Sequence, residues 1–507
     1  MNGFGCFRNL NVFQVTLKQI IMKMAVHPFR ALQNRIFQKP PPVESEKTDK
    51  DILFNELRKK EYARLDKLGH VYLDFTGGNI YPQSLIDLHH EFLQKAVYGN
   101  PHSTNPASGL SEKYIGAARK TVLDYFNAPG YDCIFTQNAS GALQIVGESY
   151  PFSPAAHLLL TADNHNSVNG IREYARTKGA GFSYSSMNCE DLSLDDSDLE
   201  KHLDAHPDKM EKLFAFPAQS NVSGVRHSLS WIKKAQDKGW DVLLDAAAFV
   251  PTSKLDLSAT CPDFVSVSFY KIFGYPTGIG CLLIKKSTFS KLKKPSFAGG
   301  TITLSAVTYS SYFLKQDHEK FENGTVNYLD IPAITNGLEF ISCIGIENIN
   351  ARIKELGLFI IQELTLLRHD NGLAVIKLYG PADMENRGGT FLMNFMDIHG
   401  RFYPLQYIEQ MANAGMISFR TGCFCNPGID ELNHSISSGH LKSYFDSRHH
   451  GDYFDFINFL GRMRGAVRIS IGIPTTRSDL QKFVQFVKQF LNGTIPEHSI
   501  TTPQQLS

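Results

Sequence analysis

Hydrophobic and polar residues alternate along the chain in a way that predicts short strands separated by helices. Between residues 109 and 339, short runs rich in Val, Ile, Leu and Phe indicate buried strands. Segments 111–126 and 228–238, which lie between such runs, are typical of helices. Because strands that alternate with helices pair in parallel through crossover connections, this part of the chain predicts an α/β fold with a mostly parallel sheet.

The pattern changes near residue 340, where a long helix at 350–368 precedes short strands such as 388–395. A helix at 52–65 and a strand at 71–75 are expected at the start of the folded part. The predicted domains are a basic N-terminal arm and linker (1–50), a segment that joins the small domain (51–90), a large α/β domain (91–340), a small α+β domain (341–492) and a loose polar tail (493–507).

The N-terminal segment is basic and apolar, and it permits two interpretations. Residues 1–43 contain no Asp or Glu, but they carry six Lys or Arg among Phe, Leu, Ile, Val and Met. This is the composition of an amphipathic transit peptide, which would direct the chain to a mitochondrion. The sparse hydroxyl residues favour the other interpretation, a flexible arm or a helix packed on the body.

The overall composition excludes several classes of function. A formal net charge of +1 over 507 residues provides no electrostatic footprint for nucleic acid. No apolar run reaches the roughly 18 residues that a membrane span requires. The eight cysteines are scattered, except for Cys423 and Cys425, in a chain too large to need disulfide bonds. Reduced thiols in the cytoplasm fit this pattern best.

Lys271 comes at the end of an apolar strand, 264–269, and a run rich in Gly and Pro (274–280) predicts a tight loop after it. An isolated lysine in such a place is most often a solvated surface residue. Here Ser268, Tyr270 and small residues surround it in sequence, which favours a chemical role. A lysine amine forms a Schiff base with an aldehyde when its pocket lowers its pKa. The commonest aldehyde cofactor is pyridoxal phosphate (PLP), and a PLP site requires further groups that a sequence can reveal.

PLP requires a carboxylate against its pyridine nitrogen, a ring stacked on its face and donors around its phosphate. An apolar strand that begins at Trp240 ends at Asp245, whose carboxylate would be costly to bury without a cation such as a pyridinium. His165 lies in a polar turn after another strand, where a lone histidine is most often structural but can also stack. Residues 138–141 open a helix, and their free backbone N–H groups would form an anion site.

Taken in this order, these segments resemble the class V (fold type I) family of PLP-dependent enzymes, which includes cysteine desulfurases, selenocysteine lyases and kynureninases. The resemblance covers about residues 72–491. It implies a large domain with a mostly parallel seven-stranded sheet between helices, a smaller α+β domain, and a homodimer. It also implies that Lys271 holds PLP covalently, that Asp245 pairs with the pyridine nitrogen and that His165 stacks on the ring. The phosphate would be bound by Ser140, Ser268 and Tyr270 beside the backbone of Ala139, and Thr325 would reach the phosphate of the neighbouring subunit. Asn221 would lie near the cofactor hydroxyl and the substrate carboxylate.

Arg468 is a single arginine within an apolar strand of the small domain, followed by an expected helix cap at Ser478. A buried arginine needs a partner, so a structural salt bridge is one interpretation. The other is a bidentate clamp on a substrate carboxylate, for which the guanidinium fork is well suited. The position resembles that of the substrate-carboxylate arginine of the family.

Cys423 and Cys425 lie in a loop bounded by Gly and Pro, and Arg420 precedes them. A nearby cation suits an accessible thiol of lowered pKa. A metal site is the weaker alternative because no cluster with ligand spacing accompanies the pair, and buried packing thiols are another. The run RTGCFCNPG resembles the loop of group II cysteine desulfurases, and still more that of the amino-terminal domain of molybdenum cofactor sulfurases.

That resemblance implies that Cys425 accepts sulfur and that Arg420 assists Arg468 in substrate binding. The polar insertion at 429–464, with His449 and His450 expected to be solvated, is also typical of the molybdenum cofactor sulfurases. Ala248 departs from the pattern, since desulfurases usually have a glutamine there, directed toward the cofactor hydroxyl. The carboxy-terminal domain of the eukaryotic sulfurases is not expected in 507 residues, and with it the usual sulfur recipient.

The leading hypothesis is a PLP-dependent cysteine desulfurase-like enzyme that converts L-cysteine to alanine and leaves a persulfide on Cys425 for a sulfur-acceptor protein. The alternative is a class V aminotransferase or lyase that acts on another amino acid without a persulfide. A third interpretation is a PLP-fold scaffold that only binds a partner. The presence of Lys271, Asp245, His165 and Arg468 together argues against it, because a scaffold needs none of them.

Overall fold

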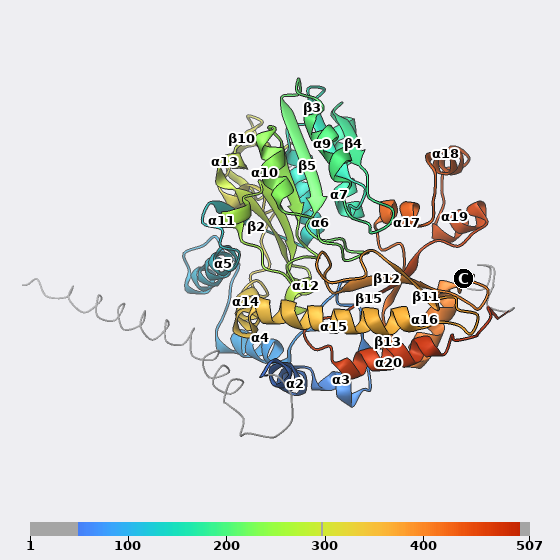
Figure 1. The fold of residues 1–507 in the computed structure, drawn as a ribbon. Coiled ribbons are helices and arrows are strands. Elements are labelled where there is room, and N and C mark those ends of the chain that lie inside the picture. The colour runs from blue at the N-terminus through green and yellow to red at the C-terminus, as the bar shows by residue number, and fades with distance from the viewer. Residues whose placement is uncertain (1–48, 296–297, 497–507) are drawn as a thin grey trace, which may run out of the picture.

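The computed structural model describes residues 49–295 and 298–496 (Figure 1). The predicted N-terminal arm lies outside these residues except for positions 49 and 50, as do residues 497–507 of the predicted tail. Within the described part of the chain, no helix is long and apolar enough to cross a membrane.

A seven-stranded sheet organises the first half of the chain. Its strand order is β2-β8-β7-β6-β5-β3-β4, and β8 runs opposite to the other six strands. The strands are β2 (Tyr131–Thr136), β3 (Ala156–Thr161), β4 (Gly181–Ser185), β5 (Glu211–Pro217), β6 (Asp241–Asp245), β7 (Phe264–Ser268) and β8 (Gly280–Lys285). The predicted mostly parallel α/β sheet is thus confirmed.

Both faces of this sheet are buried, since successive residues of its central strands enter two different hydrophobic clusters. Leu158 and Leu160 of β3 join one cluster, whereas Leu159 joins the other, and Phe214 and Ala215 of β5 divide in the same way. Helices α6 (Ala139–Ser149) and α8 (Ile171–Thr177) pack in one cluster, and α9 (Asp196–Asp204) and α10 (Ser230–Asp237) pack in the other. The remaining helices of this region are α5 (Pro106–Tyr125), α7 (Asn166–Asn169), α11 (Leu257–Thr260), α12 (Phe269–Phe273) and α13 (Lys286–Phe289).

A four-stranded antiparallel sheet, in the order β11-β12-β15-β14, forms the second half, as the predicted α+β lobe requires. Its strands are β11 (Ile376–Tyr379), β12 (Thr390–Phe395), β14 (Arg420–Gly422) and β15 (Ala466–Ser470). Its helices are α14 (Ala333–Ile344), α15 (Ile346–Leu366), α16 (Leu405–Ala414), α17 (Pro427–Asn433), α18 (Ser438–Asp446), α19 (Tyr453–Leu460) and α20 (Arg477–Lys488). Figure 1 shows α18 and α19 projecting from the body on the side of α17.

The N-terminal segment packs against this second half. It contains α2 (Asp49–Glu61), α3 (Ala63–Lys67), β1 (Val71–Tyr72) and α4 (Gln83–Lys95). Strand β1 pairs in parallel with β13 (Ile417–Ser418), although more than 300 residues separate the two in sequence. A separate hairpin consists of β9 (Ile302–Ala306) and β10 (Ser311–Leu314), followed by a 3-10 turn, η1 (His318–Lys320). The exact domain boundaries stay a prediction.

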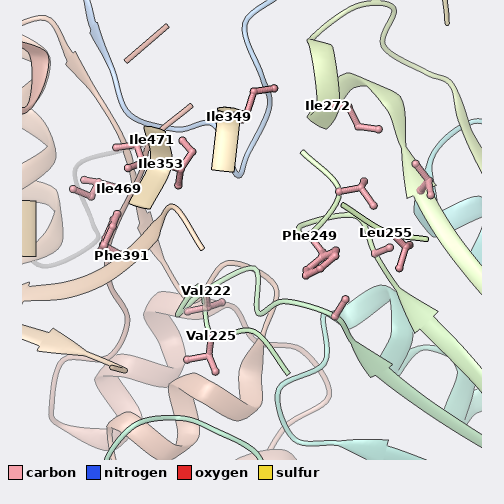
Figure 2. Close-up of a cluster of buried hydrophobic side chains, with 14 of the residues drawn as sticks. Val222, Val225, Phe249, Leu255, Ile272, Ile349, Ile353, Phe391, Ile469 and Ile471 are labelled. Carbon is pink, nitrogen blue, oxygen red and sulfur yellow. The ribbon is translucent and has the colours of Figure 1, made fainter. Parts of the chain in front are cut away.

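One continuous hydrophobic cluster joins the two halves (Figure 2). In it, Phe249 and Ile272 from the first half share a core with Ile353 of α15, Phe391 of β12 and Ile469 of β15. Because protein interiors are closely packed, this shared core fixes the orientation of the two sheets relative to each other.

Four local predictions are corrected by the structure. The helix expected at 52–65 is broken at Tyr62 into α2 and α3, and the strand expected at 71–75 pairs regularly only over β1. The cap of α20 is Thr476, whose side chain accepts from the backbone N–H of Asp479, and not Ser478. Lys271 lies in the short helix α12, three residues beyond the end of β7, because the chain turns helical before Gly274 (φ 84°) ends that helix.

Candidate active site

A cavity of about 140 Å³ lies where β5, β6 and β7 end, at the carboxyl edge of the large sheet. Ligand sites in open α/β sheets occur at this edge because loops there can converge above the strand ends. Eight of the predicted residues line the cavity: Ala139, Ser140, His165, Asn221, Asp245, Ser268, Tyr270 and Lys271. The fold therefore brings together residues that lie more than 130 positions apart in sequence.

Lys271 enters this cavity from α12. Burial lowers the pKa of Lys271, the carboxylate of Asp245 opposes that effect, and the nearby cations of Arg468 and Arg420 lower the pKa further. The neutral amine is therefore more abundant than in a solvated lysine, and the neutral amine is the nucleophile that attacks an aldehyde.

Asp245 is held at the end of β6 with a fixed orientation. Its Oδ1 accepts hydrogen bonds from the backbone N–H of Ala247 (3.1 Å) and from the hydroxyl of Ser266 (2.9 Å). No hydrogen bond to its Oδ2 is found among the described residues, and the carboxylate borders the cavity. This second oxygen can accept from a protonated ring nitrogen.

His165 contributes a neutral ring to the same cavity. Burial lowers the pKa of His165, as do the cations Lys271 and Arg468, and Asp245 only partly offsets this. Its Nδ1 accepts from the backbone N–H of Ser167 (3.0 Å), which fixes the ring at the start of α7. An uncharged, fixed imidazole suits stacking against an aromatic ligand.

The start of α6 forms the polar end of the cavity. The Asn138 side chain caps the helix by accepting from the backbone N–H of Gly141 (3.0 Å), and the Ser268 hydroxyl accepts from the N–H of Ala139 (2.8 Å). The hydroxyls of Ser140 and Ser167 lie 2.6 Å apart. A helix N-terminus with hydroxyl donors is a suitable site for a phosphate.

Gly280 permits the close packing behind this end of the cavity. A Cβ there would lie 2.5 Å from the carbonyl oxygen of Val267 and 2.6 Å from the backbone carbon of Asn138. The start of α6 and the end of β7 could not approach each other with any other residue at position 280. With an amine, a carboxylate, a neutral ring and an anion site in one cavity, the residues present fit PLP.

Arg468 reaches the site from β15 and is held on two sides. Its two terminal nitrogens donate to the carbonyl of Asn221 (2.9 Å) and to Asp74 Oδ1 (2.9 Å), whereas its buried Nε has no hydrogen-bond partner in the described part of the chain. Arg420 donates to the other oxygen of Asp74, at 2.8 and 3.1 Å. The salt bridge considered for Arg468 is thus present, and the unpaired Nε leaves a donor for an incoming carboxylate. The roles of Arg468 and Arg420 in substrate binding stay predictions.

Asp74 is a residue that the sequence reasoning missed. It stands in the run VYLDF as a single acid among apolar residues, which is the same signal that selected Asp245. Its carboxylate joins Arg468 and Arg420, which come from neighbouring strands of the small sheet. Gln219 was also missed: it lines the cavity and donates to the carbonyl of Ala248 (3.0 Å), the residue that departs from the desulfurase pattern.

The loop that carries Cys425 lies beside the cavity, with its backbone anchored to Asn166 of α7 and to Asn221 in the turn after β5. The carbonyl of Cys425 accepts from the N–H of Asn166 (2.7 Å), and the carbonyl of Phe424 accepts from the side chain of Asn221 (2.9 Å). Cys425 is exposed, whereas Cys423 is half-buried and burial raises its pKa. Cys425 is therefore the more accessible of the two thiols.

Thr325 does not line this cavity. It lies at a second cavity of about 470 Å³, and its hydroxyl is 3.4 Å from the side-chain oxygen of Asn100. Since its predicted role concerns a neighbouring subunit, that role stays a prediction. His449 and His450 are exposed, as expected. No group of three or more His, Cys, Asp and Glu side chains placed to hold a metal was found in residues 49–295 and 298–496.

Fold and cavity together define a fold type I transferase, with a lysine, a carboxylate and a histidine at the carboxyl edge of a mostly parallel sheet. The family described as aminotransferase class-V matches residues 71–483, and the chain belongs to that family. Among curated proteins, it is 35% identical to the molybdenum cofactor sulfurase of Arabidopsis thaliana, over 87% of this chain and 59% of that protein. It is 37% identical to the molybdenum cofactor sulfurase of Bos taurus, over 85% of this chain and 51% of that protein. The chain thus spans little more than half the length of these relatives.

Solved structures share the fold. The cysteine desulfurase of Thermococcus onnurineus NA1 superposes with a TM-score of 0.72 at 22% identity, covering 89% of this chain and 100% of that chain. A cysteine desulfurase of Escherichia coli superposes with a TM-score of 0.67 at 20% identity, covering 86% of this chain and 98% of that one. The expected fold class and family are confirmed.

Proposed function

We propose that this chain is a PLP-dependent, cysteine desulfurase-like enzyme that removes sulfur from L-cysteine, yields alanine and carries the sulfur as a persulfide on Cys425. The observation that carries the proposal is the anchoring of the exposed Cys425 loop, through Asn166 and Asn221, to the edge of a cavity that contains Lys271. The names of the relatives, molybdenum cofactor sulfurase and cysteine desulfurase, support the same reaction.

Four groups of the chain would hold the cofactor. The Lys271 amine would bind its aldehyde carbon, Asp245 its pyridine nitrogen, and His165 its ring face, with the start of α6, Ser268 and Tyr270 at its phosphate. When bound, PLP supplies an electron-withdrawing ring that stabilises negative charge at the α-carbon of an amino acid.

The residues of the chain then have separate tasks. Arg468 and Arg420 orient the substrate carboxylate, and Lys271, as a neutral amine, takes the proton from the α-carbon. The Cys425 thiolate attacks the substrate sulfur, so that a sulfur–sulfur bond forms and the carbon–sulfur bond breaks. The electron pair of the broken bond stays with the carbon skeleton, which gains protons and leaves as alanine.

A second function stays open because of Ala248. A glutamine is expected at this position in desulfurases, and here the neighbouring Gln219 donates to the Ala248 carbonyl. This change near the cavity favours a class V aminotransferase or lyase that acts on another amino acid without a persulfide. Analysis of the products formed from cysteine, alanine and kynurenine distinguishes the two functions.

The decisive experiment is incubation of the PLP-loaded protein with L-cysteine, followed by mass analysis of the peptide that contains Cys423 and Cys425. We expect one added sulfur on Cys425, retained in Cys423→Ala and absent in Cys425→Ala. Unchanged alanine release by Cys425→Ala without an added thiol would exclude Cys425 as the nucleophile.

We further propose a cytoplasmic homodimer that delivers its sulfur to an acceptor protein. The exposed hairpin β9–β10, with Val307, Tyr309 and Phe313 at its surface, and the position of Thr325 outside the cavity of its own chain support the dimer. Sedimentation equilibrium measures its assembly state, and fractionation measures its compartment.

A further inference from the structure

A fully buried carboxylate, Asp163, lies two residues beyond the end of β3 and has no part in the chemistry proposed above. Its Oδ2 accepts from Nε2 of His227 at 2.9 Å, and the two side chains are 0% and 1% exposed. Its Oδ1 accepts from the hydroxyl of Ser220 (2.9 Å) and from the side-chain amide of Asn426 (2.8 Å). A charge removed from water needs such partners, and the His227 ring is the only partner of Oδ2 found among the described residues.

These donors come from the segments that meet at the active site. Asp163 precedes His165 by two residues, and Ser220 precedes Asn221, while Asn426 directly follows Cys425. The amide of Asn426 also donates to the side-chain oxygen of Asn221 (3.1 Å). The Asp163 carboxylate is therefore the point at which the ring-stacking turn, the Asn221 turn and the cysteine loop are joined.

Asn426 transmits this arrangement into the cysteine loop. Its Oδ1 accepts from the N–H of Ile429 (3.4 Å) and so caps α17, which follows the loop. Two residues further along, a Cβ at Gly428 would lie 2.1 Å from the carbonyl oxygen of Ala162, so the loop packs directly on the residue before Asp163. With Gly422, Phe424 and Cys425 all at positive φ, the loop backbone depends on contacts outside itself.

We propose that His227 is a positioning residue for sulfur transfer: through Asp163 and Asn426 it holds the cysteine loop where the Cys425 thiol can meet the substrate sulfur. This inference rests on the proposed function for its chemistry, but the placement of the loop is a property of the folded chain alone. Loss of the His227 donor leaves Oδ2 of a buried carboxylate unpaired. Asp163 then turns toward other donors or water, which moves its Oδ1 away from the Asn426 amide.

His227 touches neither Lys271 nor the start of α6 in any hydrogen bond of the described residues, so capture of PLP should not depend on it. Substitution of His227 should therefore lower sulfur transfer to Cys425 without lowering the amount of bound PLP, whereas a general loss of folding would lower both. A misplacement of about 1 Å at a reacting group lowers its rate on the order of a hundredfold. We expect the transfer of sulfur to Cys425 to fall by at least about tenfold.

The test compares three histidine variants. His227→Phe keeps the bulk but has no donor, and His227→Gln keeps an N–H that can reach Asp163. His369→Phe is the matched control, because His369 is also buried and its ring is hydrogen-bonded, through Nε2 to the carbonyl of Met396 and through Nδ1 to the N–H of Asn492, away from the site. For each we would measure bound PLP, sulfur on Cys425 after a single addition of L-cysteine, and alanine release with excess dithiothreitol.

We expect His227→Phe to bind PLP as the native chain does, to form persulfide at least about tenfold more slowly, and to recover alanine release when dithiothreitol replaces Cys425 as acceptor. His227→Gln and His369→Phe should stay within about threefold of the native rate. Asn426→Ala, which keeps the His227–Asp163 pair, should reproduce the His227→Phe defect. A parallel loss of PLP and persulfide, or equal effects of His227→Phe and His369→Phe, would overturn the proposal.

A readout without cysteine separates this inference from the proposed function. The rate at which iodoacetamide alkylates Cys425 reports the freedom of the loop, and we expect it to rise in His227→Phe and in Asn426→Ala but not in His369→Phe. If the native chain forms no persulfide but alkylation changes as expected, the loop assignment stands and only the proposed function fails. If alkylation of Cys425 is the same in all these variants, the positioning role is refuted.

Discussion

Arg468 permits a quantitative test of substrate recognition, by replacement with methionine. The guanidinium donates to Asn221 and Asp74 and keeps one buried donor, Nε, unpaired. Arg468 and Arg420 share the single carboxylate of Asp74, so one positive charge is left over for a substrate carboxylate. A hydrogen bond to a charged group contributes about 1.5–3 kcal/mol. Its loss corresponds to a dissociation constant weakened roughly 10- to 150-fold.

The assay uses two amines that carry no sulfur and differ only in a carboxylate, L-alanine and ethylamine. Binding of each to the PLP-loaded protein is followed by absorbance immediately after mixing, before any turnover. We expect Arg468→Met to weaken the binding of L-alanine roughly 10- to 150-fold. The dissociation constant of ethylamine should change by no more than about twofold. Arg401→Met is the control, since Arg401 forms a similar 2.7 Å pair with the buried Asp397, outside the cavity lining.

The outcome for ethylamine decides between a clamp and a structural salt bridge. If Arg468→Met weakens the binding of both amines equally, the arginine only supports the fold, and the assignment of a carboxylate clamp is wrong. The fold itself should survive, because Asp74 keeps its two hydrogen bonds from Arg420. Thermal unfolding of the variant measures this separately.

Two further predictions concern the amine and the cysteine loop. Because burial and the Arg468 cation lower the pKa of Lys271, its capture of PLP, trapped with borohydride and located by mass, should persist at a pH where an ordinary lysine is protonated. Arg468→Met raises that pKa, so the capture curve should move to higher pH, and an unchanged curve would contradict the assigned cause. Gly428→Ala places a Cβ 2.1 Å from the carbonyl oxygen of Ala162 and should cost about 1–3 kcal/mol in unfolding free energy, measured with urea. Gly439→Ala, whose Cβ would contact only Ser437 Oγ at 3.6 Å, should be nearly neutral, and equal losses in both variants would contradict the packing argument.

The sequence was most informative where a short apolar strand ends in a polar residue. Asp245 could be selected because a carboxylate at the end of a buried strand needs a partner, and the loop near Lys271 could be selected because of its glycines and proline. The parallel sheet then places such strand ends at one edge, so the two groups meet without further information. Eight of the predicted residues line one cavity for this reason.

What sequence reasoning missed depends on contacts between distant segments. Asp74 bonds to Arg468 across 394 positions, and Asn426 bonds to Asp163 across 263. Neither contact follows from local periodicity, because the first arises only when the N-terminal segment packs on the small sheet and the second only when the small lobe docks against the large domain. Helix α12 was missed for a related reason: it is too short to show a period, and its ends are set by the strand before it and by Gly274 after it.

The groups of the active site come from different parts of the fold, and this division suggests how the two halves act together. Lys271, Asp245 and His165 lie on or beside the large sheet and are the residues proposed to hold the cofactor. Arg468 and Cys425 come from the small lobe, so they reach their positions only when that lobe is docked. The shared core that contains Phe391, Ile469 and Phe249 holds it there (Figure 2), and the Asp163 and Asp74 carboxylates then fix the cysteine loop and the arginine pair locally. We therefore expect a change at the junction to impair sulfur transfer more than cofactor capture, which depends on the small lobe only through the effect of the Arg468 and Arg420 cations on the pKa of Lys271.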